Sequence, residues 1–274
     1  MTSTTGPPLG RASIDLNADL GEGVSGDAGM DPDLLDDLLL QQVSSANVAC
    51  GGHAGDERSM ARVCRTAVQR GVSIGAQVSY VDRSGFGRTR LAVAHATLVA
   101  QLAEQVATLR EIAKGEGATV TYVKPHGALY NAAADDRSVA ASIVESLLHD
   151  SGQHGHPPYP LLTLPGCALA QAAAARGVRV VGEAFADRAY TADARLVPRG
   201  TPGAVLDDVE DVVSRVVRLA TEGVVRGIDG VDLPITAESV CLHSDTPGAA
   251  RTAARVRTAL SDAGVAVVPF TAAT

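Results

Sequence analysis

The chain has 274 residues, of which 46% are hydrophobic, and its 23 basic and 31 acidic side chains give a formal charge of −8. A chain of this length can bury one large core, so a single domain is the first expectation. The lack of a run of about 18 apolar residues argues against a membrane span, and an acidic chain without a basic block argues against nucleic acid or an anionic membrane as a partner.

The amino terminus and the cysteines bear on the setting of the protein. Residues 1–13 (MTSTTGPPLGRAS) contain no apolar run of the kind found in signal peptides, so we expect a disordered leader followed by a single domain over residues 14–270. The cysteines are too few and too scattered for a disulfide framework, which predicts a reducing, cytoplasmic environment. They are Cys50, Cys64, Cys167 and Cys241.

Short apolar runs alternate with longer amphipathic runs, as in parallel strands connected by crossover helices. The predicted strands are Ile14–Ala18, Ser45–Cys50, Ser73–Gln77, Val120–Val123, Leu161–Leu164, Val178–Glu183 and Val240–His243. The predicted helices are Pro32–Gln42, Asp56–Arg70, Ala94–Lys114, Asp135–His149, Cys167–Arg176, Asp207–Glu222 and Pro247–Ala263. Seven βα units predict an α/β protein with a TIM-like (βα)7 barrel, in which VAVVPF at 265–270 is a candidate closing strand. An open doubly wound sheet is the alternative.

Proline, glycine and aspartate indicate where helices begin and end. Pro32 and Pro247 suit the first turn of a helix, where the missing N–H costs nothing. Gly71 and Gly177 suit helix C-caps, and Asp56 suits an N-cap.

Residues 149–160 (HDSGQHGHPPYP) form the most loop-like interior segment. Its three histidines, His149, His154 and His156, allow a metal interpretation. A Gly/Pro-rich polar stretch with scattered histidines is more typical of a solvated connection, so we expect a loop.

Polar clusters follow the predicted strands, at the point where each strand ends. In parallel α/β folds these ends converge on one face, where the functional site is built. The clusters therefore predict one site at the carboxyl ends of the strands. They are NADLGE (17–22), CGGHAGD (50–56), QVSYVD (77–82), KPHGALYN (124–131), EAFADRAY (183–190) and HSDTPG (243–248).

Asp15, Asn17 and Asp19 alternate along the first predicted strand and therefore share one of its faces. If that face lines the barrel, Asp19 can act as a general base or bind a hard metal ion. The alternative is that Asp19 and Glu22 cap the turn in DLGEG, and the sequence favours neither interpretation.

His53 follows the second predicted strand, in a glycine-rich turn that projects its side chain near the site. Cys50 and His53 have the spacing of half a zinc site. No matching second half occurs in the sequence, and a structural zinc site usually needs four ligands, so zinc bound in that way is not expected.

The clusters after the sixth and seventh predicted strands contain acids, arginines and a histidine. Arg188 and Arg199 suit bidentate contacts with a carboxylate or a phosphate, and the alternative is an ion pair of either one with Asp187. His243 and Asp245 can bind each other or one substrate. Asp245 can instead cap the helix predicted at 247.

Lys124 is one of only two lysines in the chain. The other, Lys114, lies in a polar helix end where any cation would serve. Lys124 stands between an apolar strand and Pro-His-Gly, which places it and His126 in the predicted site, and a solvated lysine is the alternative.

Two motifs that would identify a chemistry are absent from the sequence. There is no G-x-x-x-x-G-K-[ST] phosphate loop and no G-x-S-x-G nucleophile elbow. By themselves the residues predict a barrel hydrolase that uses carboxylates, histidines and one lysine.

Six segments occur in order along the chain: IDLNADLGEG, SSANVACGGHAGD, VKPHGALYN, FADRAY, LVPRGTPGAV and CLHSDTPGA. This series resembles the motifs of the LamB/YcsF lactam-utilisation family, which contains the A subunit of prokaryotic ATP-dependent 5-oxoprolinase. The resemblance runs from residue 14 to residue 270, and the order of all six segments makes it specific.

The resemblance implies a (βα)7 barrel related to the glycoside hydrolase/deacetylase superfamily. It also implies a cytoplasmic enzyme that opens 5-oxo-L-proline to L-glutamate while ATP, with Mg²⁺, is converted to ADP and phosphate. In that family the A, B and C subunits work together, so the B and C subunits are the expected partners, and a homo-oligomer is a further option. No tightly bound metal is expected.

If the resemblance holds, the chemistry of the reaction suggests roles for four catalytic side chains. Lys124 would stabilise the charge on a phosphate or an oxyanion. The residues expected to transfer protons are His126, Asp19 and His53. Weak metal candidates are Asp19, His53 and His243. The expected substrate- or nucleotide-binding residues are Asn17, Glu22, Gln77, Tyr130, Asn131, Glu183, Asp187, Arg188, Arg199, His243 and Asp245.

Gln77 departs from the family pattern, since many members have a histidine here, in GAHPSF. An amide hydrogen-bonds but does not titrate, so the departure argues against a deacetylase-like metal site built on this position. Two alternatives to lactam opening by this chain remain: a non-catalytic barrel that binds substrate or regulates the enzyme, and a metal-dependent deacetylase-like amidohydrolase.

Overall fold

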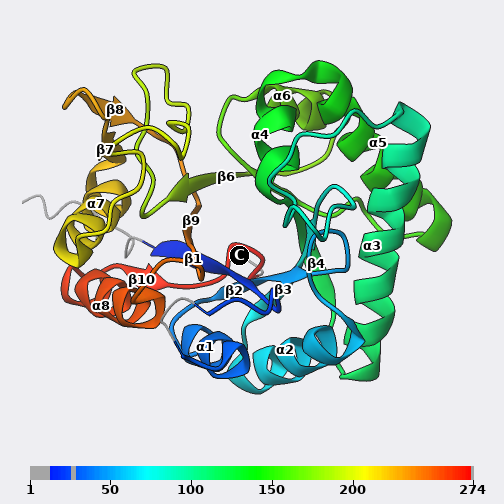
Figure 1. Cartoon of the computed structure of the whole chain (residues 1–274), viewed down its shortest axis with the longest axis horizontal. Helices are drawn as coiled ribbons and strands as arrows, with labels where there is room; N and C mark the ends of the chain where they lie inside the picture. The colour runs from blue at the N-terminus through cyan, green and yellow to red at the C-terminus, as the bar shows by residue number, and fades with distance from the viewer. Residues whose placement is uncertain (1–12, 26–28, 273–274) are drawn as a thin grey trace, which may run out of the picture.

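Seven parallel strands close into a barrel in this computed structural model, which describes residues 13–25 and 29–272. The strands are β1 (Ser13–Leu20), β2 (Ser45–Ala49), β3 (Ser73–Val78), β4 (Val120–Pro125), β5 (Leu161–Thr163), β6 (Val180–Phe185) and β9 (Ser239–Leu242). Each strand pairs with the next, and β9 pairs with both β6 and β1 (Figure 1). The predicted leader lies outside the described residues apart from Ser13, which begins β1.

The predicted strand order is confirmed, and the closing contact between β1 and β9 makes the open-sheet alternative wrong. The candidate closing strand at 265–270 is also wrong. Only β10 (Ala266–Val267) forms there, and it pairs with Ser13 and Ile14. Strand β9 pairs with the next four residues of β1, from Asp15, and so it closes the barrel.

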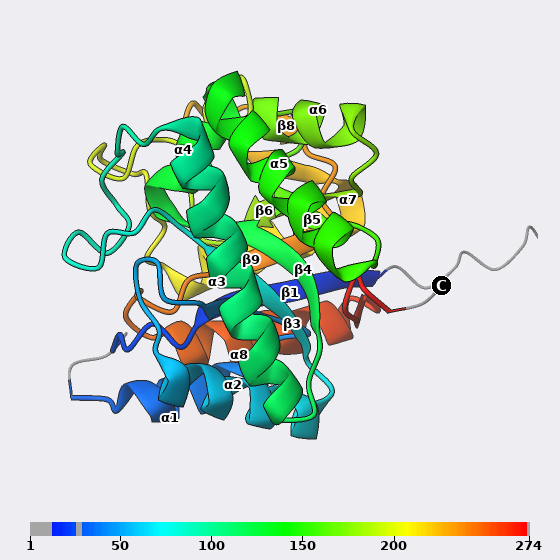
Figure 2. The same ribbon diagram turned by 90° about the vertical axis from the view of Figure 1, so that its right-hand side faces the viewer.

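Eight helices of the described chain surround the barrel (Figure 1). They are α1 (Pro32–Leu39), α2 (Glu57–Arg70), α3 (His95–Gly115), α4 (Gly127–Asp135), α5 (Arg137–His154), α6 (Ala168–Ala175), α7 (Val209–Glu222) and α8 (Ala249–Asp262). Helices α3 and α5 lie side by side on one flank of the barrel (Figure 2). None of the described helices is long and apolar enough to cross a membrane.

The sequence missed helix α4 and a small hairpin. The hairpin joins β7 (Val224–Arg226) to β8 (Asp232–Pro234) between α7 and β9. Helix α4 begins at Gly127, within the strand-end segment at 124–131, and its backbone leaves the helical conformation at Asp136, which then caps α5 with its side chain. The polar strand-end signal in KPHGALYN concealed this helix.

Most of the predicted helix ends are confirmed. Pro32 begins α1, Asp56 caps α2 with its carboxylate on the backbone N–H of the third helical residue, and Gly71 ends α2 with a positive φ of 68°. Gly177, with φ of 73°, follows the end of α6. Pro247 is wrong as a first-turn residue, because Gly248 has a positive φ and α8 begins only after it.

The loop predicted at 149–160 is wrong in its first half, because α5 continues to His154 and ends at Gly155. Asp150 stabilises this extension by pairing with Arg110 at 2.5 Å. Nε2 of His156 lies 3.2 Å from Asp150 and Nε2 of His154 lies 3.7 Å from it. These histidines contact an acid, and the group of metal-binding side chains found in the described chain lies elsewhere.

The barrel interior beneath the site is largely polar, with a small separate apolar cluster of Tyr122, Leu162 and Val181, and the main apolar core lies between the barrel and the helices. Along β1, Leu16 and Ala18 are buried in that core, whereas Asp15 and Asn17 bond other strands inside the barrel. The predicted shared face of β1 is therefore confirmed as the inward face. Polar side chains that bond across the barrel interior support the functional site at the carboxyl ends of the strands.

Glycine at position 75 makes room for a large ring inside the barrel. A Cβ atom there would lie 2.1 Å from the ring of Tyr122, which stands opposite Gly75 on β4. The Tyr122 hydroxyl donates to Oδ1 of Asn47 at 2.7 Å, and its ring packs edge-on against Phe270. This ring closes the barrel beneath the site.

Candidate active site

A cavity of about 670 Å³ opens at the carboxyl ends of the strands, and its walls include residues that follow β1, β4, β6 and β9. Ten predicted site residues line it: Asp19, Glu22, Lys124, His126, Tyr130, Asn131, Arg188, Arg199, His243 and Asp245. Five others bond to lining residues from behind: Asn17, His53, Gln77, Glu183 and Asp187. The structure thus brings the predicted residues together around one cavity.

Lys124 occupies the floor of the cavity, where it contacts side chains of β1, β6 and β9. Its Nζ atom lies 2.9 Å from Oε1 of Glu183 and 3.0 Å from Oδ1 of Asp19. It also contacts Oδ1 of Asn17 at 3.3 Å and the sulfur of Cys241 at 3.2 Å. The interpretation of Lys124 as a solvated lysine is wrong, since only 2% of this residue is exposed.

Both ends of the ion pair between Lys124 and Asp19 stay charged. Burial favours the neutral amine, but the carboxylates of Asp19 and Glu183 hold the pKa of Lys124 well above its usual value. Burial likewise favours a protonated Asp19, but the ammonium of Lys124 holds the pKa of this carboxyl well below its usual value. The alternative in which Asp19 and Glu22 cap a turn is wrong. Asp19 pairs with Lys124, and Glu22 contacts His53 and Gln77.

Amide side chains hold the carboxylates in place. Asn47 donates to Oδ1 of Asp19 at 2.9 Å and to Oδ1 of Asn17 at 2.6 Å. Asn17 in turn donates to Glu183 at 3.2 Å and to the hydroxyl of Ser239 at 2.7 Å. Because these groups come from different strands, the closed barrel fixes the distance between the two acids that face Lys124.

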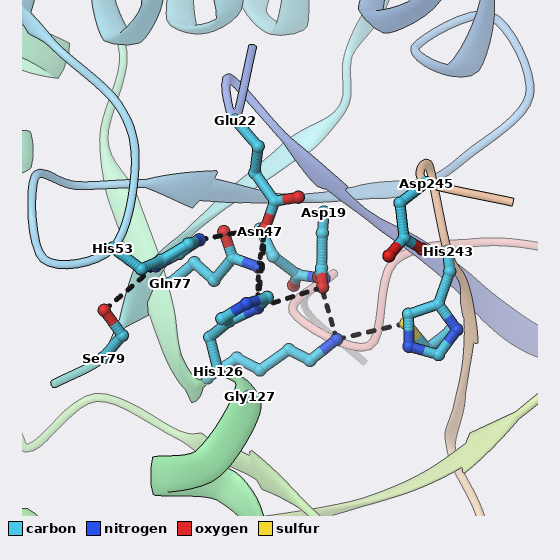
Figure 3. A network of polar contacts seen from close by, with 12 residues as sticks. Asp19, Glu22, Asn47, His53, Gln77, Ser79, His126, Gly127, His243 and Asp245 are labelled. Carbon is cyan, nitrogen blue, oxygen red and sulfur yellow. Dashed lines mark hydrogen bonds and ion pairs between the residues drawn. The ribbon is translucent and has the colours of Figure 1, made fainter. Parts of the chain in front are cut away.

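His53 and His126 stack beside this ion pair, with ring centroids 3.8 Å apart and planes 7° from parallel (Figure 3). Nε2 of His53 lies 3.0 Å from Oε1 of Glu22. Nδ1 of His126 lies 3.4 Å from Oδ2 of Asp19 and 2.8 Å from Nε2 of Gln77. Gln77 also donates to Glu22 at 2.9 Å, so it connects the two histidines through one acid.

Ser79 fixes the ring of His53 from behind. Its hydroxyl contacts Nδ1 of His53 at 2.9 Å, and Gln105 accepts from the backbone N–H of Ser79. Burial lowers the pKa of His53 below its usual value, although Glu22 opposes this shift. The ring of His53 is therefore positioned and largely neutral at neutral pH.

One group in the described part of the chain has the composition and spacing of a metal site. It contains Glu22, His53 and His126, whose ligand atoms lie within 4.8 Å of one another. Of the three weak metal candidates only His53 belongs to it, because Asp19 pairs with Lys124 and His243 pairs with an acid on the other side of the cavity. The half zinc site with Cys50 does not form, since the Cys50 thiol contacts the carbonyl oxygen of Gln77.

His243 forms a buried pair with Asp187, at 2.7 Å from Nδ1 to Oδ1. Burial opposes the charge on His243, but Asp187 raises the pKa of this imidazole above its usual value. Thr246 donates to the second oxygen of Asp187 at 3.2 Å, and the ring of Phe185 stacks on His243. The alternative interpretation, an ion pair of Asp187 with Arg188 or Arg199, is therefore wrong, because Asp187 pairs with His243.

Arg188 holds the β6–α7 loop, residues 186–208, beside the cavity. Its guanidinium donates to the carbonyl oxygens of Val197 at 2.6 Å and Ala204 at 3.4 Å. Only 6% of Arg188 is exposed. Two loop carbonyls thus take up Nε and Nη2 of the guanidinium that was expected to bind a carboxylate or a phosphate.

Two more exposed arginines share one acid at the cavity mouth. Nη2 of Arg88 lies 2.5 Å from Oδ2 of Asp245, and Nη1 of Arg199 lies 3.9 Å from the same oxygen. This acid does not cap α8, whose N-cap is Gly248. One carboxylate between two guanidinium groups leaves an excess of positive charge at the mouth, which suits an anionic ligand.

Tyr130 and Asn131 lie on the first turns of α4 at the cavity wall. Tyr130 is buried with its ring edge-on to Phe185, and burial together with nearby Glu183 raises the pKa of its hydroxyl well above the usual value. Asn131 is exposed, and its amide bonds the carbonyl oxygen of Gly127 within the helix. Both can contact a ligand that enters from the mouth.

Among the side chains of this site that sequence reasoning missed are Arg88, Arg195 and Cys241. Arg88 and Arg195 lie in loops beyond the predicted strand-end clusters, so no local signal marked them. Cys241 had a signal, because it stands two residues before His243 on a strand whose alternate residues face inward.

Known proteins resemble this chain along nearly all of its length. A family model described as the LamB/YcsF family matches residues 14–274. A protein from Streptomyces griseus subsp. griseus, named as the A subunit of 5-oxoprolinase, is 52% identical over 257 residues, which cover 94% of this chain and 99% of that protein. A protein of the same name from Mycobacterium avium is 48% identical over 264 residues, with the same coverage.

A solved structure agrees with these sequence matches. The crystal structure of a lactam utilization protein from Thermus thermophilus has a TM-score of 0.84 at 37% identity, covering 94% of this chain and 100% of that chain. The motif series, the seven-stranded barrel and these relatives point to one assignment. The chain belongs to the LamB/YcsF family.

Proposed function

We propose that this chain is the A subunit of an ATP-dependent 5-oxoprolinase, which opens 5-oxo-L-proline to L-glutamate and converts ATP to ADP and phosphate. The observation that carries the proposal is the cavity, which combines a buried charged floor at Lys124 with an arginine mouth. The relatives are named as the A subunit of 5-oxoprolinase, which supports 5-oxo-L-proline as the substrate.

The substrate has two groups that match the two ends of the cavity. Its carboxylate suits the guanidinium groups of Arg88 and Arg199 at the mouth, which form charge-assisted hydrogen bonds. Its lactam carbonyl would then point to the floor, toward Lys124 and His126. A volume of about 670 Å³ holds a five-membered ring together with further groups.

ATP has a chemical reason in this reaction, because a lactam is an unactivated amide. The lactam oxygen takes the γ-phosphoryl group and ADP leaves. Water adds to the ring carbon, the C–N bond breaks as nitrogen takes a proton, and a second water releases phosphate from the acyl phosphate. The sum consumes one ATP and two waters and yields glutamate, ADP and phosphate.

The residues at the cavity floor have distinct parts in this scheme. The ammonium of Lys124 stabilises negative charge that develops on the lactam or phosphoryl oxygens. The side chain of His126 is 12% exposed and lines the cavity, so it is placed to transfer the proton that the lactam nitrogen takes up. Asp19 remains ionised beside Lys124 and serves by keeping the ammonium in position.

The B and C subunits are the proposed partners, since the relatives are named as one subunit of an enzyme. The test is turnover of 5-oxo-L-proline by this chain with and without these partners, and with and without Mg²⁺-ATP. We expect glutamate and ADP in equal amounts only when all components are present, and loss of both with His126→Gln. Glutamate formed with neither ATP nor partners, or normal turnover by the variant, would overturn the proposal.

A further inference from the structure

Three potential metal-ligand atoms converge beside the cavity. The atoms are Oε1 of Glu22, Nε2 of His53 and Nδ1 of His126, all within 4.8 Å of one another (Figure 3). Glu22 and His126 also line the cavity, so the point where the three meet borders the space that a ligand would fill.

The hydroxyl of Ser79 bears on the tautomer of His53. Its Oγ atom lies 2.9 Å from both the carbonyl oxygen of Tyr80 and Nδ1 of His53, and when its single proton goes to Tyr80 it accepts from Nδ1. In the neutral ring, Nε2 of His53 then carries a lone pair, and this lone pair faces Oε1 of Glu22 at 3.0 Å. Two acceptors at this distance repel each other unless a cation or a proton lies between them.

Gln77 determines the tautomer of His126. Its Nε2 atom donates one proton to Nδ1 of His126 at 2.8 Å and the other to Oε1 of Glu22 at 2.9 Å. Nδ1 of His126 is therefore an acceptor as well, and Nε2 of His53 receives no proton from the amide. The amide oxygen of Gln77 is buried and has no hydrogen-bond partner among the described residues.

We propose that Glu22, His53 and His126 bind a divalent transition-metal ion, for which Zn²⁺ is the best match. Two imidazoles and one carboxylate are a common zinc-binding set, and they leave a fourth position on the side of the cavity. A half-turn of the Gln77 amide exchanges its nitrogen for its oxygen, which converts a competing donor into a further ligand. Ser79 supplies the support behind the ring that zinc-binding histidines usually have.

This ion differs from the Mg²⁺ that accompanies ATP, because Mg²⁺ prefers oxygen ligands. At position 77 this chain has a glutamine where many family members have a histidine, so an amide oxygen takes the place of an imidazole nitrogen as a ligand. The other three ligands, Glu22, His53 and His126, remain in place. Ion binding stands independently of the proposed function. If that function holds as well, an ion at this point polarises the lactam carbonyl, a consequence that rests on the proposed function.

The test is calorimetric titration of the full chain, freed of metal with EDTA, with Zn²⁺ and then Co²⁺ in the absence of substrate, ATP and partners. We expect one ion per chain and a visible Co²⁺ absorption band. Glu22→Gln and His126→Gln should each weaken binding at least about tenfold. His95→Gln is the matched control, since His95 faces Glu145 at 3.0 Å on the surface, and it should bind as the wild type does.

The Gln77→Glu variant tests whether a misfolded chain explains the weaker binding of the other variants. A carboxylate in place of the amide adds a charged ligand, so this variant should bind Zn²⁺ about tenfold more tightly, which a misfolded chain cannot do. Absence of saturable binding by the wild type, or unchanged binding by both Glu22→Gln and His126→Gln, would mean that only a proton lies between Glu22 and His53. Failure of lactam turnover in the assembled enzyme would count against the proposed function alone.

Discussion

The ammonium of Lys124 lies 2.9 Å from Oε1 of Glu183 in the middle of the barrel, and the two side chains are 3% and 0% exposed. Asp19 adds a second carboxylate at 3.0 Å. One ammonium between two carboxylates leaves an excess of negative charge in a dry interior. A buried charge of this kind is stable only while its partners remain, so the group is both a structural and a chemical unit.

Lys124→Met should therefore destabilise the protein by roughly 3 to 5 kcal/mol, because Asp19 and Glu183 would stay buried without a counter-ion. Urea unfolding of the purified chain measures this change. The double variant Lys124→Met with Glu183→Gln should recover part of the loss. Lys114→Met is the control, since Lys114 is exposed. A Lys124→Met protein as stable as the wild type would contradict the assigned ion pairs.

Gly75→Ala should destabilise the protein by about 1 to 3 kcal/mol, as overpacking of an interior does. The added Cβ would meet the Tyr122 ring at 2.1 Å, and this ring is held by its bond to Asn47 and its contact with Phe270. Thermal and urea unfolding provide the measurement.

Gly115→Ala is the matched control, because Gly115 ends α3 with no atom within 4 Å of an added Cβ and without a positive φ. This variant should be as stable as the wild type or slightly more stable. Equal effects of the two substitutions would show that the Tyr122 ring moves aside freely.

The strand order and the place of the site could be predicted from the sequence because both follow from local periodicity. The alternation of Asp15, Asn17 and Asp19 fixes a shared face on any strand, and parallel strands bring their polar ends together. The composition of the chain made Lys124 conspicuous. No knowledge of tertiary contacts was needed for these features.

The partners of these residues could not be predicted, since they depend on contacts between remote segments. Glu183 reaches Lys124 only because the barrel closes, and Glu22 meets His53 across two loops. Arg188 carried the same local signal as a ligand-binding arginine, yet its Nε and Nη2 atoms donate to loop carbonyls. Local sequence does not encode which way a loop folds back.

The buried pair of His243 and Asp187 predicts a pH dependence of stability. The pKa of His243 is raised above 6.5, so its contribution is present below pH 6.5 and is lost as pH rises through the folded pKa. The pKa of Asp187 is lowered below 3.8, so its contribution is present above pH 3.8 and is lost as pH falls through the folded pKa. Both contributions are present between about pH 4 and pH 6.5.

Asp187→Asn should therefore cost the most stability between about pH 4 and pH 6.5, and less as pH rises above that window. Urea unfolding at a series of pH values from about 4.5 to 9, on the order of half a unit apart, measures the difference from the wild type. His243→Gln should give the same profile, and the double variant should cost little more than either single change. A constant difference across this range would contradict the charged pair.

Arg199→Gln should raise the KM for 5-oxo-L-proline by roughly 10- to 150-fold in the assembled enzyme, with little change in kcat. The reason is that a guanidinium at the mouth would bind the substrate carboxylate equally in the ground state and the transition state, and such a bond contributes about 1.5 to 3 kcal/mol. Arg199 lines the cavity and is held only loosely by Asp245, at 3.9 Å. Initial rates of glutamate and ADP formation provide the measurement.

Two controls separate this contact from a general loss of positive charge. Arg65→Gln removes an exposed arginine that pairs with Glu116 and does not line the cavity, so it should leave KM unchanged. 2-Pyrrolidinone has the same lactam ring without the carboxylate, so its low rate of turnover should be the same in Arg199→Gln and in the wild type. If both lactams lost the same factor, Arg199 would act on the shape of the mouth, and the carboxylate would bind elsewhere.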